Sequence, residues 1–343
     1  NEKKPNILLI GGTGVGKSSL VNLIFGKQLA TTGIGAPVTK TIDKFESEDT
    51  SVVLFDSKGY EIGTSIEKDF IDDVVQYAER SRGTEQAIHL VWYCIQGANG
   101  RITDFDIATI KKMQSMQIPV AVVITKAELL TEDESTVFIG VIKKELLDIS
   151  VFETSAKDKK QSYHLNGLLE WSVELLPEAQ KIAFIAAQKI DMKIKRNAAE
   201  AVINQHTSMA FSVGFVPIPT SDAPLLIANQ VSMIVRVISI YDLKSLSKDL
   251  TTRMISTFIS GIVVRTGMWA AGSLLKLVPG VGTAVGGVIN GAVGSSITWA
   301  LGQAIIELCE HIIKNGISDF SGLPQQVNNY VSFLEKAFKR NYK

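Results

Sequence analysis

The sequence has few of the residues that build disulfide frameworks or metal clusters. Its 343 residues include two cysteines, Cys94 and Cys309, and four histidines. Two thiols exclude a disulfide framework and leave too few ligands for a cysteine zinc site. Because the histidines do not cluster with the cysteines, we expect no structural metal ion either.

The chain also lacks an excess of either charge, with 35 basic and 35 acidic side chains. This balance excludes a basic surface over the whole chain, so nucleic acid is not an expected partner. The first residues, NEKKPNILLI, are typical of a strand rather than a signal sequence, which favours a cytoplasmic protein. However, the mean hydropathy is +0.18 and only 20% of the residues are charged, which is apolar for a cytosolic enzyme.

The balanced total is the sum of two unlike parts. Residues 1–176 carry 19 basic and 25 acidic side chains, a net charge of −6, whereas residues 177–343 carry 16 and 10, a net charge of +6. The chain is also too long for one compact core. We therefore expect two domains, 1–176 and 177–343, that meet at Leu176 and Pro177.

The two parts predict different fold classes. In the first part, short β-branched runs alternate with helical patterns, which predicts an α/β domain with a doubly wound, mostly parallel sheet. The runs are NILLI, VVLF, HLVWYCI, PVAVVIT and DISVFET, and the helical patterns lie near 17–26, 66–82, 104–116, 134–147 and 164–176. The second part has no period-2 alternation and reads as helices interrupted by glycine and proline, which predicts an all-α domain.

A glycine-rich segment directly follows the first expected strand. It reads GGTGVGKS from Gly11 to Ser18, the G-x4-G-K-S pattern of a P-loop. Glycines let backbone N–H groups converge on a phosphate, and the next helix adds its positive N-terminal end. A glycine-rich turn without a ligand is the alternative. We expect the nucleotide to contact Gly12, Thr13, Gly14, Val15, Gly16, Lys17, Ser18 and Ser19, with Lys17 on the β- and γ-phosphates and Ser18 on Mg²⁺.

Two more segments predict contacts to Mg²⁺ and the γ-phosphate. APVTK places Thr39 where a switch threonine would complete the Mg²⁺ shell, although Thr41 is a rival and an ordinary strand-edge threonine is the alternative. VVLFDSKG ends a strand at Asp56, whose carboxylate would hold Mg²⁺ through water, and the Gly59 N–H would face the γ-phosphate. The predicted metal-binding residues are Ser18, Thr39 and Asp56, and the predicted catalytic residues are Lys17, Thr39 and Gly59.

Two later strand ends predict the base-binding side. Thr125-Lys126-Ala127-Glu128 follows PVAVVI and is close to the guanine pattern N/T-K-x-D, in which the carboxylate accepts from two guanine N–H groups. Glutamate adds a methylene there, so we expect weaker guanine affinity or selectivity; an exposed strand end is the alternative. After ISVFET, a backbone N–H of the next loop would meet the guanine O6. The expected base-binding residues are Thr125, Lys126, Glu128, Ser155, Ala156 and Lys157.

With these five segments in order, residues 5–176 resemble a GTPase domain of the translation-factor-related P-loop class. The resemblance implies binding of GTP or GDP with Mg²⁺ and hydrolysis by in-line attack of water. The P-loop is similar to that of immunity-related GTPases, septins and the AIG1/Toc group, and GRITDFD is similar to the latter groups. Gly14 stands where potassium-activated relatives carry asparagine, so we expect no activation by potassium.

The segment after D-x-x-G departs from the Ras-like pattern. Tyr60 replaces the glutamine that orients water, so we expect slow intrinsic hydrolysis. Relatives without that glutamine often gain activity by dimerisation, which implies a nucleotide-dependent homodimer. Lys58 and Arg101 are candidates for a phosphate contact, but a solvated lysine and an arginine beside a helix capped by Thr103 are the favoured alternatives.

The apolar excess lies in the second part of the chain. Residues 277–306 contain no charged side chain and include seven glycines, and residues 209–235 contain a single charge, Asp222. The two segments share a Val-Pro opening, at Val216-Pro217 and Val278-Pro279, which suggests a duplicated hairpin. The length permits a transmembrane helix, and association with a lipid surface or a packed soluble core are equal alternatives. The net charge of +6 favours an anionic lipid surface.

The arrangement also resembles a bacterial GTPase family with a hydrophobic helical C-terminal domain of unknown function and a V/I-P-x-P signature, here Val216 to Pro219. That family is similar to immunity-related and dynamin-like GTPases, which implies coupling of nucleotide state to a membrane. Three functions follow as hypotheses: a GTPase that acts at a membrane, a nucleotide-gated binding module with negligible turnover, and a membrane-inserting effector controlled by its GTPase domain.

Overall fold

A computed structural model describes residues 3–26, 36–37, 39, 41–46, 50–57, 66–156, 165–213, 222–243, 284–316, 336 and 340–341. The contacts divide the chain into two compact units, Asn1–Asp191 and Met192–Lys343. Several positions singled out in the sequence lie outside the described residues, namely Lys58, Gly59, Tyr60, Lys157, Val216-Pro217 and Val278-Pro279.

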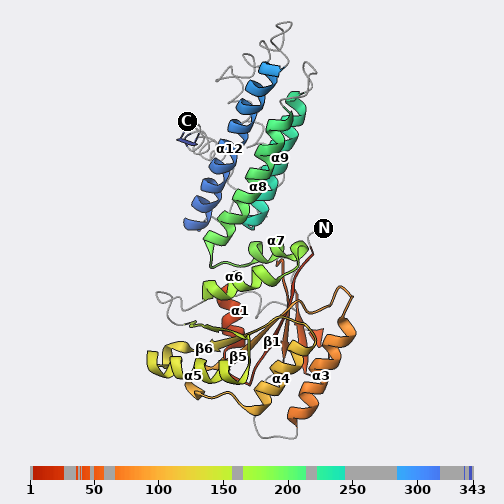
Figure 1. Ribbon diagram of the computed structural model, residues 1–343, viewed down its shortest axis with the longest axis vertical. Helices are drawn as coiled ribbons and strands as arrows, with labels where there is room; N and C mark the ends of the chain where they lie inside the picture. Colours follow the sequence, from red (N-terminus) through yellow and green to blue (C-terminus); the bar gives the residue numbers. More distant parts are fainter. Residues whose placement is uncertain are drawn as a thin grey trace. The chain divides into compact units, whose positions relative to one another are not determined.

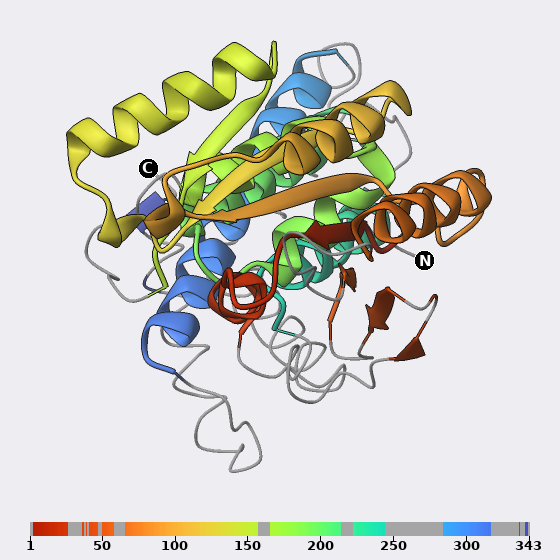
Figure 2. The ribbon, with the colours of Figure 1, turned by 90° about the horizontal axis from the view of Figure 1, so that it is seen from below.

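The first unit is built on one twisted sheet, as Figures 1 and 2 show. Within the described residues the sheet has seven strands in the order β2-β3-β4-β1-β5-β6-β7. The four pairings among β4, β1, β5, β6 and β7 are parallel, and β3 runs antiparallel to both β2 and β4. The strands are β1 (Asn6–Ile10), β2 (Ala36–Pro37), β3 (Ile42–Phe45), β4 (Val53–Ser57), β5 (Leu90–Gln96), β6 (Val120–Thr125) and β7 (Ser150–Glu153). This confirms the expected doubly wound, mostly parallel sheet.

Helices cover both faces of the sheet. On one face, α3 (Ile66–Ser81), α4 (Asp104–Ser115) and α5 (Glu132–Glu145) pack their apolar sides against β-strand residues such as Phe55 and Tyr93. On the other face lie α1 (Lys17–Phe25), α6 (Leu165–Leu175) and α7 (Glu178–Ala187), where Phe25 stacks on Trp92 with ring centroids 6.1 Å apart. Burial of both faces explains why the central strands read as continuous apolar runs.

Helix α7 packs against the sheet, although it follows the boundary that composition suggested. Its Phe184 packs edge-on against Trp92, and Gln180 Nε2 lies 3.2 Å from His89 Nε2. The Lys189 N–H also donates to the carbonyl of Ile24 at 2.7 Å. The contacts therefore group residues up to Asp191 with the first unit, and the expected domain boundary at Leu176 and Pro177 stays a prediction.

The second unit contains the long helices α8 (Met192–Val213), α9 (Asp222–Ile240) and α12 (Ala284–Lys314), and no strand occurs among its described residues. This confirms the expected all-α class. Gly302 of α12 lets α8 approach closely, because a Cβ at this position would lie 2.5 Å from Ile203 Cγ1. Arg196 of α8 binds Glu310 of α12, with Nε 3.0 Å from Oε1.

The later part of the uncharged run, from residue 294 to 306, is packed within this unit, since Ile297, Ala300, Leu301 and Ile305 of α12 are buried. Among the described helices, none is both long enough and apolar enough to cross a membrane.

Candidate nucleotide-binding site

The P-loop joins the end of β1 to the start of α1. Gly11, Gly14 and Gly16 have φ angles of 152°, 73° and 114°, which residues other than glycine rarely adopt. A Cβ on Gly11 would also lie 2.4 Å from the carbonyl oxygen of Cys94 in β5. The sheet thus fixes where the loop begins, and the loop leads into the N-terminal end of α1, a favourable place for an anion.

Lys17 is the first residue of α1 and is buried beneath the loop. Its ammonium donates to the carbonyl of Gly11 at 2.8 Å and to that of Gly12 at 3.5 Å, and it lies 3.9 Å from Asp56 Oδ1. A buried ammonium needs such oxygen partners, and phosphate oxygens are equivalent partners. Its position therefore fits the predicted contact with phosphate.

Asp56 near the end of β4 faces the same pocket, and its Oδ1 atom is buried without a hydrogen-bond partner. Burial raises the pKa of this carboxyl to about 6; the nearby Lys17 ammonium lowers the pKa and the Asp43 carboxylate raises it further. Asp43 lies opposite Asp56 in the antiparallel pairing of β3 with β4. The sequence motifs did not identify Asp43, because no motif reveals the register of an antiparallel edge strand.

These side chains line a cavity of about 460 Å³ at the P-loop. Carboxylate and hydroxyl oxygens are the ligands that Mg²⁺ prefers, and Asp56, Ser18 and Asp43 supply them here. The Asp56 oxygen that lacks a hydrogen-bond partner is consistent with a site in which a bound cation neutralises the carboxylate. The cavity is lined by Thr13, Gly14, Val15, Gly16, Lys17, Ser18, Ser19, Asp43, Asp56, Ser57 and Lys126, which include most of the predicted phosphate-binding and metal-binding residues.

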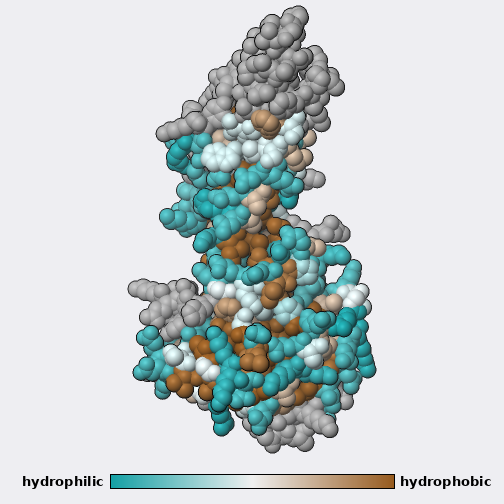
Figure 3. Space-filling model, in the orientation of Figure 1, coloured by the Kyte–Doolittle hydropathy of each residue, from teal (hydrophilic) through white to brown (hydrophobic). Residues whose placement is uncertain are grey.

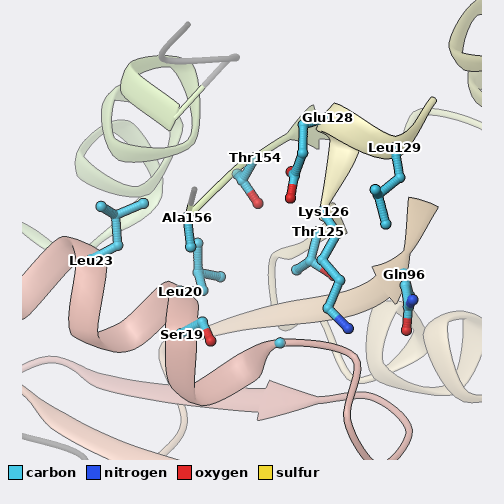
Figure 4. Close-up of a pocket in the computed structure, with 11 residues that line it drawn as sticks. Ser19, Leu20, Leu23, Gln96, Thr125, Lys126, Glu128, Leu129, Thr154 and Ala156 are labelled. Carbon is cyan, nitrogen blue, oxygen red and sulfur yellow. The ribbon is translucent and has the colours of Figure 1, made fainter. Parts of the chain in front are cut away.

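A second cavity of about 270 Å³ adjoins the first, and four of the six expected base-binding residues line it, namely Thr125, Lys126, Glu128 and Ala156 (Figure 4). Glu128 points its carboxylate into this cavity beside Thr154, and its Oε2 atom is buried without a hydrogen-bond partner. Because a buried carboxylate oxygen is costly to leave unpaired, the site fits a ligand with N–H donors. The lining residues are Gly16, Ser19, Leu20, Leu23, Gln96, Thr125, Lys126, Glu128, Leu129, Thr154 and Ala156.

The end of β6 connects the two cavities. Lys126 adopts a left-handed backbone conformation with φ 54°, and its ammonium donates to the carbonyl of Gly14 at 2.9 Å. The Thr125 hydroxyl donates to the carbonyl of Val15. The next turn is held by the Ala127 N–H, which donates to the carbonyl of Thr154 at 3.1 Å. The motif residues at 125–128 therefore brace the P-loop as well as line the base cavity.

Sequence reasoning missed several lining residues of the base cavity. Gln96 stands at the end of β5, where the carboxyl ends of parallel strands meet, so its strand-end position was the available signal. Thr154 precedes the predicted loop residue Ser155, which is buried, and Ala156, which is exposed and lines the cavity. The apolar residues Leu20 and Leu23 gave no signal, because α1 carries them in an ordinary helical pattern.

Thr39 lies in the turn that leads into β3. Its hydroxyl oxygen accepts from the backbone N–H groups of Thr41 at 3.1 Å and Ile42 at 3.0 Å. The Thr41 hydroxyl donates to Asp73 of α3. In the arrangement described, both threonines thus serve the turn and are not among the residues that line the phosphate cavity. The role of Thr39 at Mg²⁺ stays a prediction.

Arg101 lies beside a helix that is capped by Thr103, as the favoured alternative to a phosphate contact predicted. The Thr103 hydroxyl accepts from the Asp106 N–H at 3.2 Å, and Asp106 accepts from the Thr103 N–H at 2.8 Å, which forms a capping box at the start of α4. Arg101 is exposed beside this cap.

Comparison with known proteins agrees with this geometry. Residues 6–126 match the family model described as 50S ribosome-binding GTPase, and residues 178–335 match a domain of unknown function, DUF697. With the fold, the first match confirms GTP or GDP and Mg²⁺ as the expected cofactors. The second match covers the helices that we expected to be a hydrophobic domain of unknown function.

Two curated relatives show the extent of the similarity. GTPase Era of Caldicellulosiruptor saccharolyticus is 24% identical, with 57% of this chain and 67% of that protein covered. Magnetosome membrane protein 22 of Magnetospirillum gryphiswaldense is 31% identical over 33% of this chain and 58% of that protein.

Among solved structures, a single-residue variant of Era from Aquifex aeolicus bound to GDP·AlF4⁻ is 16% identical and has a TM-score of 0.37, with 61% of this chain and 68% of that chain covered. The chain thus combines a domain of the P-loop GTPase fold with a helical part that matches the DUF697 model.

Proposed function

We propose that this protein hydrolyses GTP to GDP and phosphate with Mg²⁺, slowly as a monomer and faster as a nucleotide-dependent dimer, and couples its nucleotide state to a membrane-associated helical part. The observation that carries the nucleotide assignment is the Glu128 oxygen without a hydrogen-bond partner. It lies in a cavity that shares Gly16, Ser19 and Lys126 with the cavity that Lys17 lines. A negative group for the base and a positive group for the phosphates are the two ends of one guanine nucleotide site.

The residues of this chain have separate tasks in the proposal. Lys17 exchanges its carbonyl partners for phosphate oxygens and stabilises the negative charge that develops there during hydrolysis. Glu128 accepts hydrogen bonds from the N1–H and the exocyclic amine of guanine. This excludes adenine, because adenine has no N–H donor at these two positions. Mg²⁺, when bound, neutralises phosphate charge. Asp56 and Ser18 would hold this ion, Asp56 through water.

The low intrinsic rate is proposed from Tyr60, which follows the D-x-x-G motif in place of a glutamine. The resemblance to GTPases that lack this glutamine implies that a second copy of the chain would stimulate hydrolysis. The alternative is a nucleotide-gated binding module that turns over negligibly. The two differ in one measurable property, since only a dimer-stimulated enzyme gains specific activity as its concentration rises.

Coupling to a membrane is supported by the uncharged run 277–306, by the net charge of +6 in residues 177–343, and by the similarity to a magnetosome membrane protein. Nucleic acid is left out of the proposed partners because the charge of the whole chain is balanced.

Phosphate release and nucleotide binding measured over a range of protein concentrations test this proposal. The wild-type protein should bind GTP and GDP, and its activity per molecule should rise with concentration. Lys17→Ala should lose nucleotide affinity by about 100-fold or more, since it removes a buried charged contact. Lys111→Ala, an exposed lysine of α4, is the matched control. Unchanged GTP affinity in Lys17→Ala would refute the site, and activity that stays near zero at all concentrations would favour the binding module.

A further inference from the structure

Helix α5 has two apolar sides, and only one of them faces the core of the first unit. Phe138 and Ile142 are buried against the sheet. On the opposite side, Val137 and Val141 are 67% and 44% exposed. In Figure 3 apolar side chains reach the surface at the lower left, where Figure 1 places α5. A helix on the surface of a domain normally presents polar residues to solvent, so this second apolar side is a candidate contact surface.

The exposed side of α5 has a definite order of residues along the helix. At 3.6 residues per turn, Asp133, Val137, Gly140, Val141 and Lys144 lie on one stripe, and all five are exposed. The stripe therefore has an acidic start, an apolar middle and a basic end. Gly140 in the middle is unusual, because glycine destabilises a helix relative to alanine and a Cβ here would meet nothing within 4 Å.

This order is complementary to itself when the helix is turned around. In an antiparallel pair with its two-fold axis between Phe138 and Ile139, Asp133 of one copy lies opposite Lys144 of the other. The two-fold axis repeats this pair at the other end of the contact. The same register places Val137 opposite Gly140, where the missing side chain leaves room for close approach. Two-fold pairing of one patch with itself is the commonest form of protein association.

We propose that a second copy of this chain docks on this surface, with the two α5 helices antiparallel. The two ends of the stripe complement the same helix of a second copy, whereas an anionic lipid surface would repel the acidic end. The surface contains none of the P-loop residues, so the association does not require bound nucleotide. This separates it from the nucleotide-dependent dimer of the proposed function.

Sedimentation equilibrium of the full chain, with GDP and without nucleotide, tests this surface. A contact between two single helices is small, so association is expected to be weak and the test should extend from about 5 to about 300 µM protein. Lys144→Glu places like charges opposite each other at both ends and should weaken dimerisation by about tenfold or more. Lys143→Glu changes the same charge on the same helix but lies off the stripe, and it should leave dimerisation unchanged.

The double variant Asp133→Lys/Lys144→Glu reverses both charges and should restore the association of the wild-type protein. That recovery is specific to this register, since it repairs the pairing and leaves every other surface altered. A wild-type protein that stays monomeric up to about 300 µM would overturn the proposal. Equal effects of Lys144→Glu and Lys143→Glu, or no recovery in the double variant, would overturn it as well. Loss of GTP binding or hydrolysis would leave this result untouched.

Discussion

The ammonium of Lys17 lies 3.9 Å from a carboxylate oxygen of Asp56 but gives its short hydrogen bond, 2.8 Å long, to the carbonyl of Gly11. The two charges of the phosphate cavity thus attract each other without a direct hydrogen bond. The Asp56 oxygen is left buried without a hydrogen-bond partner. In the absence of ligands, this carboxylate is a source of instability that a bound cation would relieve.

Asp56→Asn should change how stability depends on pH. The carboxyl has a pKa of about 6 in the folded chain against an ordinary value of 3.8, so the folded form binds its proton more tightly than the unfolded form. The free energy of unfolding should therefore fall as pH rises from about 4 to about 6, by up to about 3 kcal/mol. The asparagine side chain of the variant has no such proton, so the nucleotide-free variant should be the more stable protein at pH 7.

Urea denaturation of both nucleotide-free proteins at pH 5 and pH 7.5 checks this. Burial lowers the pKa of His89, which gives a pH dependence of the opposite sign, but it is common to both proteins and cancels in their difference. The same change in stability for both proteins would contradict the assignment of the raised pKa to Asp56.

Glu128→Ala should weaken GDP binding by about 10- to 100-fold, because hydrogen bonds to a charged group are worth about 1.5–3 kcal/mol each. ADP binding should stay equally weak in both proteins. Glu128→Asp, which removes one methylene, should bind GDP more tightly than the wild-type protein if the longer side chain limits guanine affinity. Fluorescence titration with labelled nucleotides measures all three. Glu132→Ala, at an exposed position in α5, is the control, and a loss of GDP affinity as large as that of Glu128→Ala would count against a specific role.

Gly302→Ala should destabilise the helical unit by about 1–3 kcal/mol, since its Cβ would lie 2.5 Å from Ile203 Cγ1 of α8. In an Ile203→Ala background the same substitution should cost less, because the obstructing atoms are gone. Gly140→Ala is the matched control, as its Cβ meets nothing and alanine favours helix; it should stabilise by up to about 1 kcal/mol. Denaturation followed by circular dichroism compares them, and additive effects of Gly302→Ala and Ile203→Ala would contradict the close contact.

Liposome flotation tests the proposed membrane coupling. The protein should float with vesicles that contain anionic lipid, because residues 177–343 carry a net charge of +6. If nucleotide state is coupled to the membrane, the bound fraction should differ between GDP and a non-hydrolysable GTP analogue. Vesicles of zwitterionic lipid are the control for charge. Absence from the lipid fraction in both nucleotide states would remove the membrane from the proposed function.

The sequence predicted the sheet and the P-loop well because both depend on local patterns. Strands such as β6 are buried on both faces and read as apolar runs, and their carboxyl ends meet at one edge, which assembled Lys126 and Glu128 beside the P-loop. Asp43 escaped prediction because its place depends on the register between β3 and β4, which is a tertiary property. Composition likewise cannot tell whether Phe184 covers a sheet or joins a bundle. The expected boundary at Leu176 therefore stays a prediction, and the match to the DUF697 model begins beside it, at residue 178.

The carbonyls of Gly14 and Val15 are hydrogen-bonded to side chains from the end of β6. The P-loop is therefore ordered when the domain folds, and little conformational entropy remains to be lost when a ligand arrives. Inorganic triphosphate, which has no base, should thus meet the same rigid template as GTP. Its affinity would report the phosphate contacts alone, and the difference from GTP would measure what recognition of the base adds to binding.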